Sequence, residues 1–276
     1  MMTSLVPWLR LLGVSCLAFP AAALEGTGQV PPLPFAVVPA AATAPVIDGK
    51  LDDACWQQAV RITELRPALD AATLGEVDAA KAGEARTTEV LLTWRPEALL
   101  IGFRCHDSTV IATPGRPRDD TLYNEDVVEV FFDPLGDGHR YWEVQVSPLG
   151  QFTDALHMVT ADPPPTPTGR LPADFYVRNH LFSLSENLAD LSVAATATPD
   201  GWSAEIALPV AVLPRTPTGP GVFSPGLMRL NLVRYDWMAP HEQPGSHLHQ
   251  ASWSPVEYGC PHQSAGRMGW IKLVAP

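Results

Sequence analysis

The chain has few basic residues, and this shortage excludes several classes of partner. Lysine and arginine number 18 against 30 aspartates and glutamates, which gives a net charge of −12 at pH 7. A surface of this sign repels phosphate backbones and anionic lipid, so neither nucleic acid nor a membrane surface is an expected partner. Neutral ligands and cations suit such a surface better.

Cysteine is also scarce, with 4 in 276 residues. No CxxC or Cys/His cluster is present, so the sequence has no zinc-finger pattern. Cys16 falls in the leader described below, and Cys55, Cys105 and Cys260 then allow one disulfide and one remaining thiol in an oxidising compartment. A Cys55–Cys105 bridge is one interpretation, and three buried cysteines that act as small apolar residues are the other.

Common catalytic motifs are missing as well. The sequence has no serine nucleophile elbow, no phosphate-cradling glycine loop and no HExxH helix. No apolar run is long enough to cross a membrane. These absences leave binding functions and carboxylate chemistry as the classes to consider.

The N-terminus predicts export. Arg10, the short apolar run 11–19 and the small residues 21–23 match a signal peptide over residues 1–23. Lipid attachment at Cys16 fits the preceding residues poorly. We therefore expect a secreted or periplasmic protein.

The remaining chain divides into a linker and one domain. Residues 24–34 have the composition of a linker, and residues 35–276 form the expected domain. Its 29 prolines and 20 glycines, counted over the whole chain, interrupt it too often for long helices. Short alternating segments between turns predict an all-β fold, an antiparallel β-sandwich of jelly-roll type with short helical turns. The expected strands cover residues 89–94, 98–106, 126–132, 140–146, 152–159, 191–197, 202–208, 228–235 and 268–274. A helical turn capped by Asp52 or Asp53 is expected over residues 52–59, with Trp56 packed under the sandwich.

One segment, residues 123–133, combines aromatic rings with acidic side chains. Alternation places Val128, Val130 and Phe132 on a core face and leaves Glu129 on the opposite face. If the following strand pairs core to core, the simplest symmetric register sets Glu129 beside Glu143.

Two adjacent carboxylates repel each other, so solvent, a cation, a shared proton or a ligand hydroxyl should relieve them. The same register sets Phe131 beside Tyr141. A face that mixes rings with hydrogen-bond acceptors suits a sugar. An ordinary solvated face with exposed glutamates is the alternative.

Several short motifs occur in order along nearly the whole mature chain. They are Ile47-Asp48-Gly49 with Trp56 and Ala59; Asp107; residues 123–133; Tyr141-Trp142-Glu143; Gly201-Trp202 with Glu205 and Pro209; Gly226 with Asn231 and Arg234; and Trp253-Ser254-Pro255 followed by Gly269. In this order the chain resembles the family 9 carbohydrate-binding modules and their wider family 9-like relatives.

The resemblance implies a β-sandwich with bound calcium and a sugar held between two aromatic rings. By position, Tyr123 and Trp253 match the two rings, and Glu129 matches a partner of the sugar hydroxyls. The alternatives are a Trp253 that anchors a loop in the core and a Tyr123 that is buried with its hydroxyl exposed. Tyr123 stands where the characterised modules have tryptophan. Glu143 stands where they have a basic residue, so their sugar preference does not carry over. Asn231 and Arg234 are expected to be internal hydrogen-bond partners.

Calcium needs about six to eight oxygens, which loop carboxylates can supply in part. The resemblance implies a calcium site. The candidate ligands are Asp48, Asp107 and Asp126, chosen from a wider group that also holds Asp52, Asp119 and Asp120.

Family 9 modules often accompany xylanases and other glycoside hydrolases in polysaccharide breakdown. We therefore expect a non-catalytic carbohydrate-binding protein with glycoside hydrolase partners. One alternative is a glycoside hydrolase that uses Glu129 and Glu143. The other is a haem-binding sandwich, for which His157, Met158 and Met228 are the candidate ligands.

Overall fold

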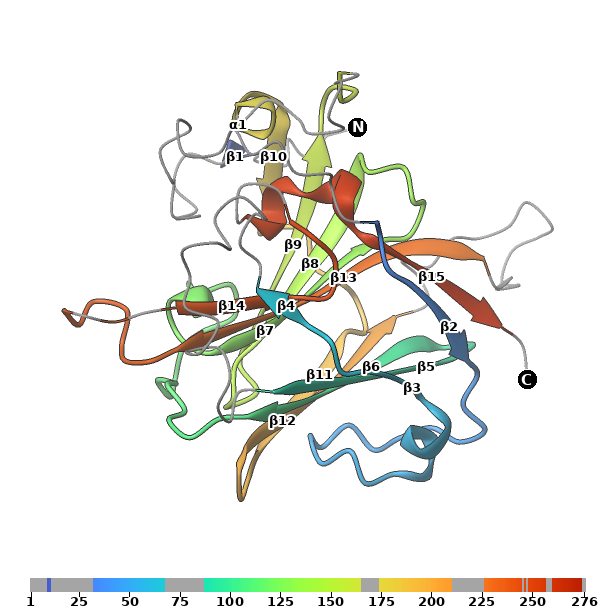
Figure 1. Cartoon of the computed structure of the whole chain (residues 1–276), viewed down its shortest axis with the longest axis vertical. Coiled ribbons are helices and arrows are strands. Elements are labelled where there is room, and N and C mark those ends of the chain that lie inside the picture. Colours follow the sequence, from blue (N-terminus) through green and yellow to red (C-terminus); the bar gives the residue numbers. More distant parts are fainter. Residues whose placement is uncertain are drawn as a thin grey trace, which may run out of the picture.

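The computed structural model describes residues 9–10, 32–67, 87–164, 174–209, 226–244, 246, 248–256 and 260–274. Two β-sheets pack face to face (Figure 1). The larger sheet contains β1 (Leu9–Arg10), β2 (Phe35–Pro39), β4 (Arg66–Pro67), β7 (Val127–Asp133), β8 (Arg140–Val146), β9 (Phe152–Val159), β10 (His180–Ser183), β13 (Leu227–Trp237), β14 (Leu248–Ser252) and β15 (Gly269–Val274). The smaller sheet contains β3 (Val60–Ile62), β5 (Thr88–Arg95), β6 (Ala98–His106), β11 (Ser192–Thr198) and β12 (Gly201–Pro209).

The larger sheet follows the order β1-β10-β9-β8-β7-β13-β14-β4, with β15 joined to β13 and to β2. The smaller sheet follows β11-β12-β6-β5-β3. The β15–β2 pair is parallel, and the other strand pairs of the described residues are antiparallel. The predicted all-β sandwich is confirmed, and each expected strand lies within about two residues of an observed one.

Helical structure is limited to short pieces. They are η2 (Ala54–Gln58), η3 (Leu122–Asn124), α1 (Phe175–Asn179), η5 (Pro261–Gln263) and η6 (Ala265–Arg267). None of the described helices has the length and apolar character needed to cross a membrane.

The N-terminal segments are described only in part. Leu9–Arg10 pair with Leu181 and Phe182 of β10 at the edge of the larger sheet, inside the expected signal peptide. Cleavage after residue 23 would remove this strand. The rest of the expected signal peptide, and residues 24–31 of the expected linker, lie outside the described residues. β2 begins at Phe35.

The core lies between the two sheets. Val128, Val130 and Phe132 of β7 face Ile101 and Phe103 of β6 across it, and all are fully buried. Each such side chain contributes about 1.5–3 kcal/mol through burial. The core face predicted from alternation is therefore confirmed.

The opposite face of β7 is buried too, which corrects the expectation of an outward face. Val127 and Phe131 pack in a second cluster with Phe175 and Tyr176 of α1 and with Met268. These covering residues are distant in sequence from β7, so the alternation along the strand carries no sign of them.

The motif around Ile47-Asp48-Gly49 is tied to the smaller sheet by Glu205. The Glu205 carboxylate accepts hydrogen bonds from the backbone nitrogens of Asp48 and Gly49 and from Trp56 Nε1, each at 2.8 Å. Trp56 packs on the outer side of the smaller sheet. Gly49 has φ +85°, and a Cβ there would lie 2.7 Å from the Ala195 backbone, so the turn needs glycine.

Two local expectations are wrong. Asp53 stands at the N-cap of η2 but makes no capping bond, because its Oδ2 accepts from the Val46 nitrogen instead. Cys55 and Cys105 are free thiols. Cys55 lies on the outer side of the smaller sheet, whereas Cys105 lies between the sheets, so the sheet separates them.

Removing the Glu205 carboxylate should destabilise the domain. Glu205→Ala leaves three buried or part-buried donors without their acceptor, and we expect a loss of at least about 3 kcal/mol in the free energy of unfolding. Urea titration followed by tryptophan fluorescence measures it. The control is Glu97→Ala, whose side chain is 67% exposed and should change stability by less than about 0.5 kcal/mol. Equal losses in the two variants would contradict the role given to Glu205.

Candidate functional site

The β7–β8 hairpin has a different register from the one expected. Glu129 lies opposite Gln145 and Phe131 opposite Glu143, rather than Glu129 opposite Glu143 and Phe131 opposite Tyr141. The shift is two residues, so every side chain keeps its predicted face. The turn accounts for the shifted register, because the Asp133 carboxylate accepts hydrogen bonds from the backbone nitrogens of Leu135, Gly136 and Gly138.

Glu129 and Glu143 nevertheless meet, through the amide of Gln145. Gln145 Nε2 donates to Glu129 Oε1 at 2.9 Å and to Glu143 Oε1 at 2.7 Å. Both carboxyl groups are buried, with relative exposures of 0% and 4%. The alternative of ordinary exposed glutamates is therefore wrong.

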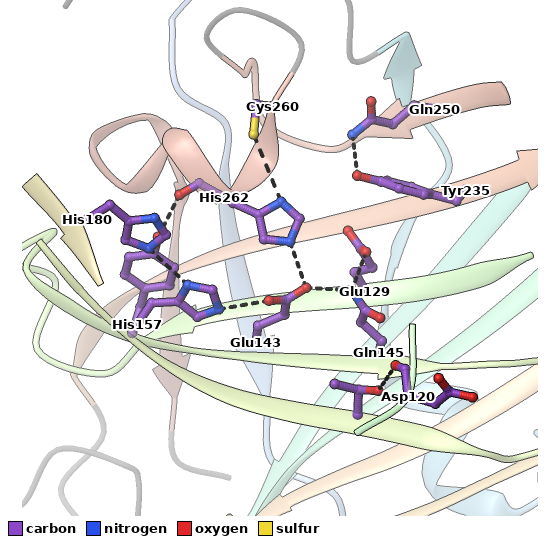
Figure 2. Close-up of polar contacts among 12 residues, drawn as sticks. Asp120, Glu129, Glu143, Gln145, His157, His180, Tyr235, Gln250, Cys260 and His262 are labelled. Atoms are coloured by element: carbon purple, nitrogen blue, oxygen red, sulfur yellow. Dashed lines mark hydrogen bonds and ion pairs between the residues drawn. The ribbon is translucent and has the colours of Figure 1, made fainter. Parts of the chain in front are cut away.

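Histidines surround Glu143 on its other sides. His262 Nε2, from η5, lies 2.9 Å from Glu143 Oε1, and His157 Nε2, from β9, lies 2.7 Å from Glu143 Oε2 (Figure 2). His157 Nδ1 lies 2.9 Å from Nε2 of His180, and all three rings are buried. We call Glu129, Glu143, Gln145, His157, His180 and His262 the buried network.

The two carboxyl groups of the network have pKa values that are shifted in opposite directions. Burial, with repulsion from Glu143, raises the pKa of Glu129 to about 8. Burial alone would also raise the pKa of Glu143, but the charge of His262 and hydrogen bonds from both histidines outweigh it and lower that pKa. The same ion pair raises the pKa of His262 to about 9 against the effect of burial. Near pH 7 the stable state is neutral Glu129 beside a Glu143–His262 ion pair.

Aromatic rings lie next to the buried network. The Tyr235 hydroxyl accepts a hydrogen bond from Gln250 Nε2 at 3.1 Å. Negative charge on Glu129 and Glu143, and on the phenol of Tyr123, raises the pKa of Tyr235 further after the dominant effect of burial. Tyr123 is itself partly exposed and packs against the second cluster, and its carbonyl accepts from Trp237 Nε1 at 3.0 Å. Tyr123 is thus the ring of this group whose exposed surface a ligand can contact.

Of the two interpretations of Trp253, a stacking ring and a core anchor, the structure favours the core anchor. Trp253 is 8% exposed and packs in the core between the sheets, against Gly269. A Cβ at Gly269 would lie 2.8 Å from the Trp253 ring, which accounts for both residues in the matching motifs. As placed, this ring stabilises the core and presents no face for stacking.

The expected calcium ligands do not gather at one point. Asp107 and Asp126 lie together with Asp236, with donor oxygens within 4.8 Å of one another. Asp48 is outside that group, and its carboxylate pairs with Lys50 at 2.6 Å. Asp236 is missed by the sequence prediction because the expected strand ended one residue before it.

Arg234 already supplies a positive charge to the aspartate group. Its Nη2 lies 3.0 Å from Asp107 and 3.3 Å from Asp236. The Asp126 carboxyl group accepts hydrogen bonds from the backbone nitrogens of Ile111 and Trp237, and burial raises its pKa to about 8. The group therefore fits an internal ion pair better than a calcium cage, which requires about six to eight free oxygen ligands.

Asn231 is also internal, as expected. Its Oδ1 accepts from the nitrogens of Leu232 and Ser254 and from the Ser252 hydroxyl. Arg234 donates to the His106 carbonyl at 2.8 Å. The predictions for Asn231 and Arg234 are confirmed.

The candidate haem ligands do not share a site. His157 and Met158 are neighbours on β9 and point to opposite faces. Met228 is fully buried in the core between the sheets. No pair of these side chains can approach a haem iron from its two sides in this arrangement.

Stability should fall as the pH rises from about 6.5 to 9. Glu129 and Asp126 both have pKa values raised to about 8, so at these two groups the folded state binds more protons than the unfolded state up to pH 8. Each of the two then costs about 1 kcal/mol per pH unit. Below about pH 6.5 the lowered pKa values of the buried His157 and His180 oppose this effect, because the unfolded state binds more protons at those rings. His262 extends the decline toward pH 9. Melting temperatures from pH 5 to 9, recorded in chelator, measure it.

Glu129→Gln supplies the comparison for this pH dependence. The variant removes one titrating group but keeps an acceptor for Gln145, so its stability should fall less steeply with pH. Glu97→Gln is the surface control and should follow the parent. A melting temperature that rises between pH 6.5 and 8 in the parent would contradict the assignment.

Comparisons with known proteins identify solved structures that share this fold. No protein-family model matches the sequence, and no curated protein sequence matches it significantly. Among solved structures, a family 9 carbohydrate-binding module from Caldicellulosiruptor kristjanssonii in complex with cellotriose has a TM-score of 0.56 and 16% identity, covering 88% of this chain and 94% of that one. The same module in complex with glucose has a TM-score of 0.54 and 16% identity, covering 87% and 96%.

A third structure, of a proposed carbohydrate-binding protein from Bacteroides uniformis, has a TM-score of 0.57 and 13% identity and covers 88% of this chain and 100% of that one. At these identities the comparisons report architecture. The chain therefore has the fold of the family 9 carbohydrate-binding modules.

Proposed function

We propose that this protein binds carbohydrate at the outer face of the larger sheet, beside Tyr123. The observation that carries the proposal is the meeting of a partly exposed ring with buried carboxyl and amide groups on the sandwich of the family 9 modules. The pyranose C–H surface stacks on such a ring, and its hydroxyls pair with carboxylates and amides.

Each group would have a separate role. Tyr123 supplies the stacking surface. Gln250, which is partly exposed, and Tyr235 supply polar atoms next to it. Glu129 lies behind them, fully buried, and would reach a hydroxyl only after a small opening of the covering residues. Glu143 is bonded to two histidines, so it acts through Gln145 and His262 rather than on the sugar.

A hydrolase is less well supported than a binding protein. Gln145 Nε2 donates to both Glu129 and Glu143, so no sugar ring fits between the two carboxyl groups as they stand. Their pKa values do differ in the way a general acid and a general base require, which is the one feature that favours catalysis.

The cellular role is part of the proposal. The expected signal peptide supports export, and the resemblance supports work beside glycoside hydrolases in the breakdown of polysaccharides such as xylan. Calcium binding also stays a prediction. At Asp107 and Asp126 it would have to displace Arg234 from the aspartate group.

Tyr123→Ala should weaken sugar binding about tenfold or more, because one lost ring contact is worth about 1.4 kcal/mol. Isothermal titration with glucose, cellotriose and xylotriose, preceded by a glycan array with and without calcium, measures it. Tyr123→Phe should retain most of the affinity, since the ring remains.

The matched control is Phe35→Ala, which removes an exposed ring on β2, a strand that pairs with β15 and not with β7 or β8. It should bind sugar like the parent. Unchanged affinity in Tyr123→Ala would overturn the proposed surface. Release of reducing sugar from xylan, abolished by Glu129→Gln, would favour the hydrolase instead.

A further inference from the structure

The buried network holds a group of donors that sugar binding does not explain. We propose that Glu129, Glu143 and His262 form a binding site for a divalent transition-metal ion of the zinc class. The inference concerns metal binding alone and stands independently of the proposed sugar binding.

Distances within the group fit one ion. A donor atom from each of the three residues lies within 4.8 Å of the other two. Zinc binds imidazole nitrogen and carboxylate oxygen at about 2.0–2.2 Å, so two donors on one ion lie about 3–3.5 Å apart. His262 Nε2 and Glu143 Oε1 are already 2.9 Å apart. Small side-chain rotations would bring Glu129 to the same ion.

A buried carboxyl oxygen without a hydrogen-bond partner favours a cation ligand at this place. Glu129 is fully buried, and its Oε2 has no hydrogen-bond partner. Leaving such an atom unpaired costs about 1–3 kcal/mol. Figure 2 shows the Glu129 carboxyl group beside the Glu143–His262 pair, on the same side of the sheet. A metal ion between these residues would replace the proton on Glu129, satisfy Oε2 and balance the charges of the two carboxylates.

Neighbouring groups orient the donors as metal sites require. His157 Nε2 lies 2.7 Å from Glu143 Oε2, the oxygen that does not face His262. The Tyr141 hydroxyl donates a hydrogen bond to the His262 carbonyl at 2.6 Å. Such outer contacts fix the direction of metal-binding carboxylates and imidazoles. The three ligands come from β7, β8 and η5, so the tertiary fold brings η5 together with a hairpin that is far from it in the sequence.

The donor types select the metal. Imidazole with carboxylates suits zinc, cobalt and related ions, whereas calcium prefers an all-oxygen set. Three protein ligands leave one tetrahedral position open. This separates the site from the Asp107–Asp126–Asp236 group, which offers oxygen only and already contains Arg234.

The test uses the purified mature chain after chelator treatment and desalting. We expect one Zn²⁺ per chain by titration against a chromophoric chelator, and the visible absorption bands of tetrahedral Co²⁺ when Co²⁺ is added instead. Glu129→Gln keeps the shape and the Gln145 contact, and it should lower Zn²⁺ affinity at least tenfold. His262→Gln should lower it as much and shift the Co²⁺ spectrum.

Controls separate this site from others. His139→Gln removes a partly exposed histidine that lies 3.1 Å from Asp162 and should bind Zn²⁺ like the parent. Tyr123→Ala should lose sugar but keep Zn²⁺, so the two proposals fail separately. The inference is overturned if the parent shows no saturable one-to-one binding, if Glu129→Gln binds as the parent does, or if Ca²⁺ binds this site more tightly than Zn²⁺.

Discussion

The burial of Glu129 and Glu143 on the outer face of the larger sheet is the constraint on which the rest of the site depends. A sheet can leave one face in water, and carboxylates there cost little. Here α1 and residues 260–268 cover that face, so each charge needs a partner. The histidines supply partners for Glu143, whereas Glu129 is left with one amide contact and a raised pKa. Both proposals, a sugar beside Tyr123 and a metal ion beneath it, follow from this incomplete compensation.

A second set of buried polar groups stabilises the sandwich and explains the matching motifs. Glu205 fixes the turn at Gly49 and the Trp56 ring, Asn231 joins β13 to the residues after β14, and Arg234 joins Asp107 to Asp236. Each is a buried acceptor or donor with several partners, so a single substitution leaves several groups unsatisfied. The motifs that carry the resemblance are thus mainly structural, which is why they indicate the fold more securely than the ligand.

Metal and sugar would use different parts of one face. Tyr123 and Gln250 are partly exposed, and the proposed ligands of the metal lie behind them. An ion at Glu129 would fix the floor under the sugar and leave one coordination position toward it. By the resemblance, Glu143 matches the position of a basic residue in the characterised modules, and His262, from a distant part of the chain, pairs with it.

Local pattern determined the strands, their core faces and the turn at Asp133, because alternation and turn chemistry depend on neighbouring residues only. It also singled out Glu129 and Glu143, whereas Tyr123 was assigned to the ligand by the family resemblance. Alternation could not decide the β7–β8 register, because a slip of two residues leaves every side chain on its face. Nor could it show that Trp253 lies in the core, that Cys55 and Cys105 lie on opposite sides of a sheet, or that His157, His180 and His262 converge on Glu143. These contacts join segments far apart in the sequence, so only the tertiary structure decided them.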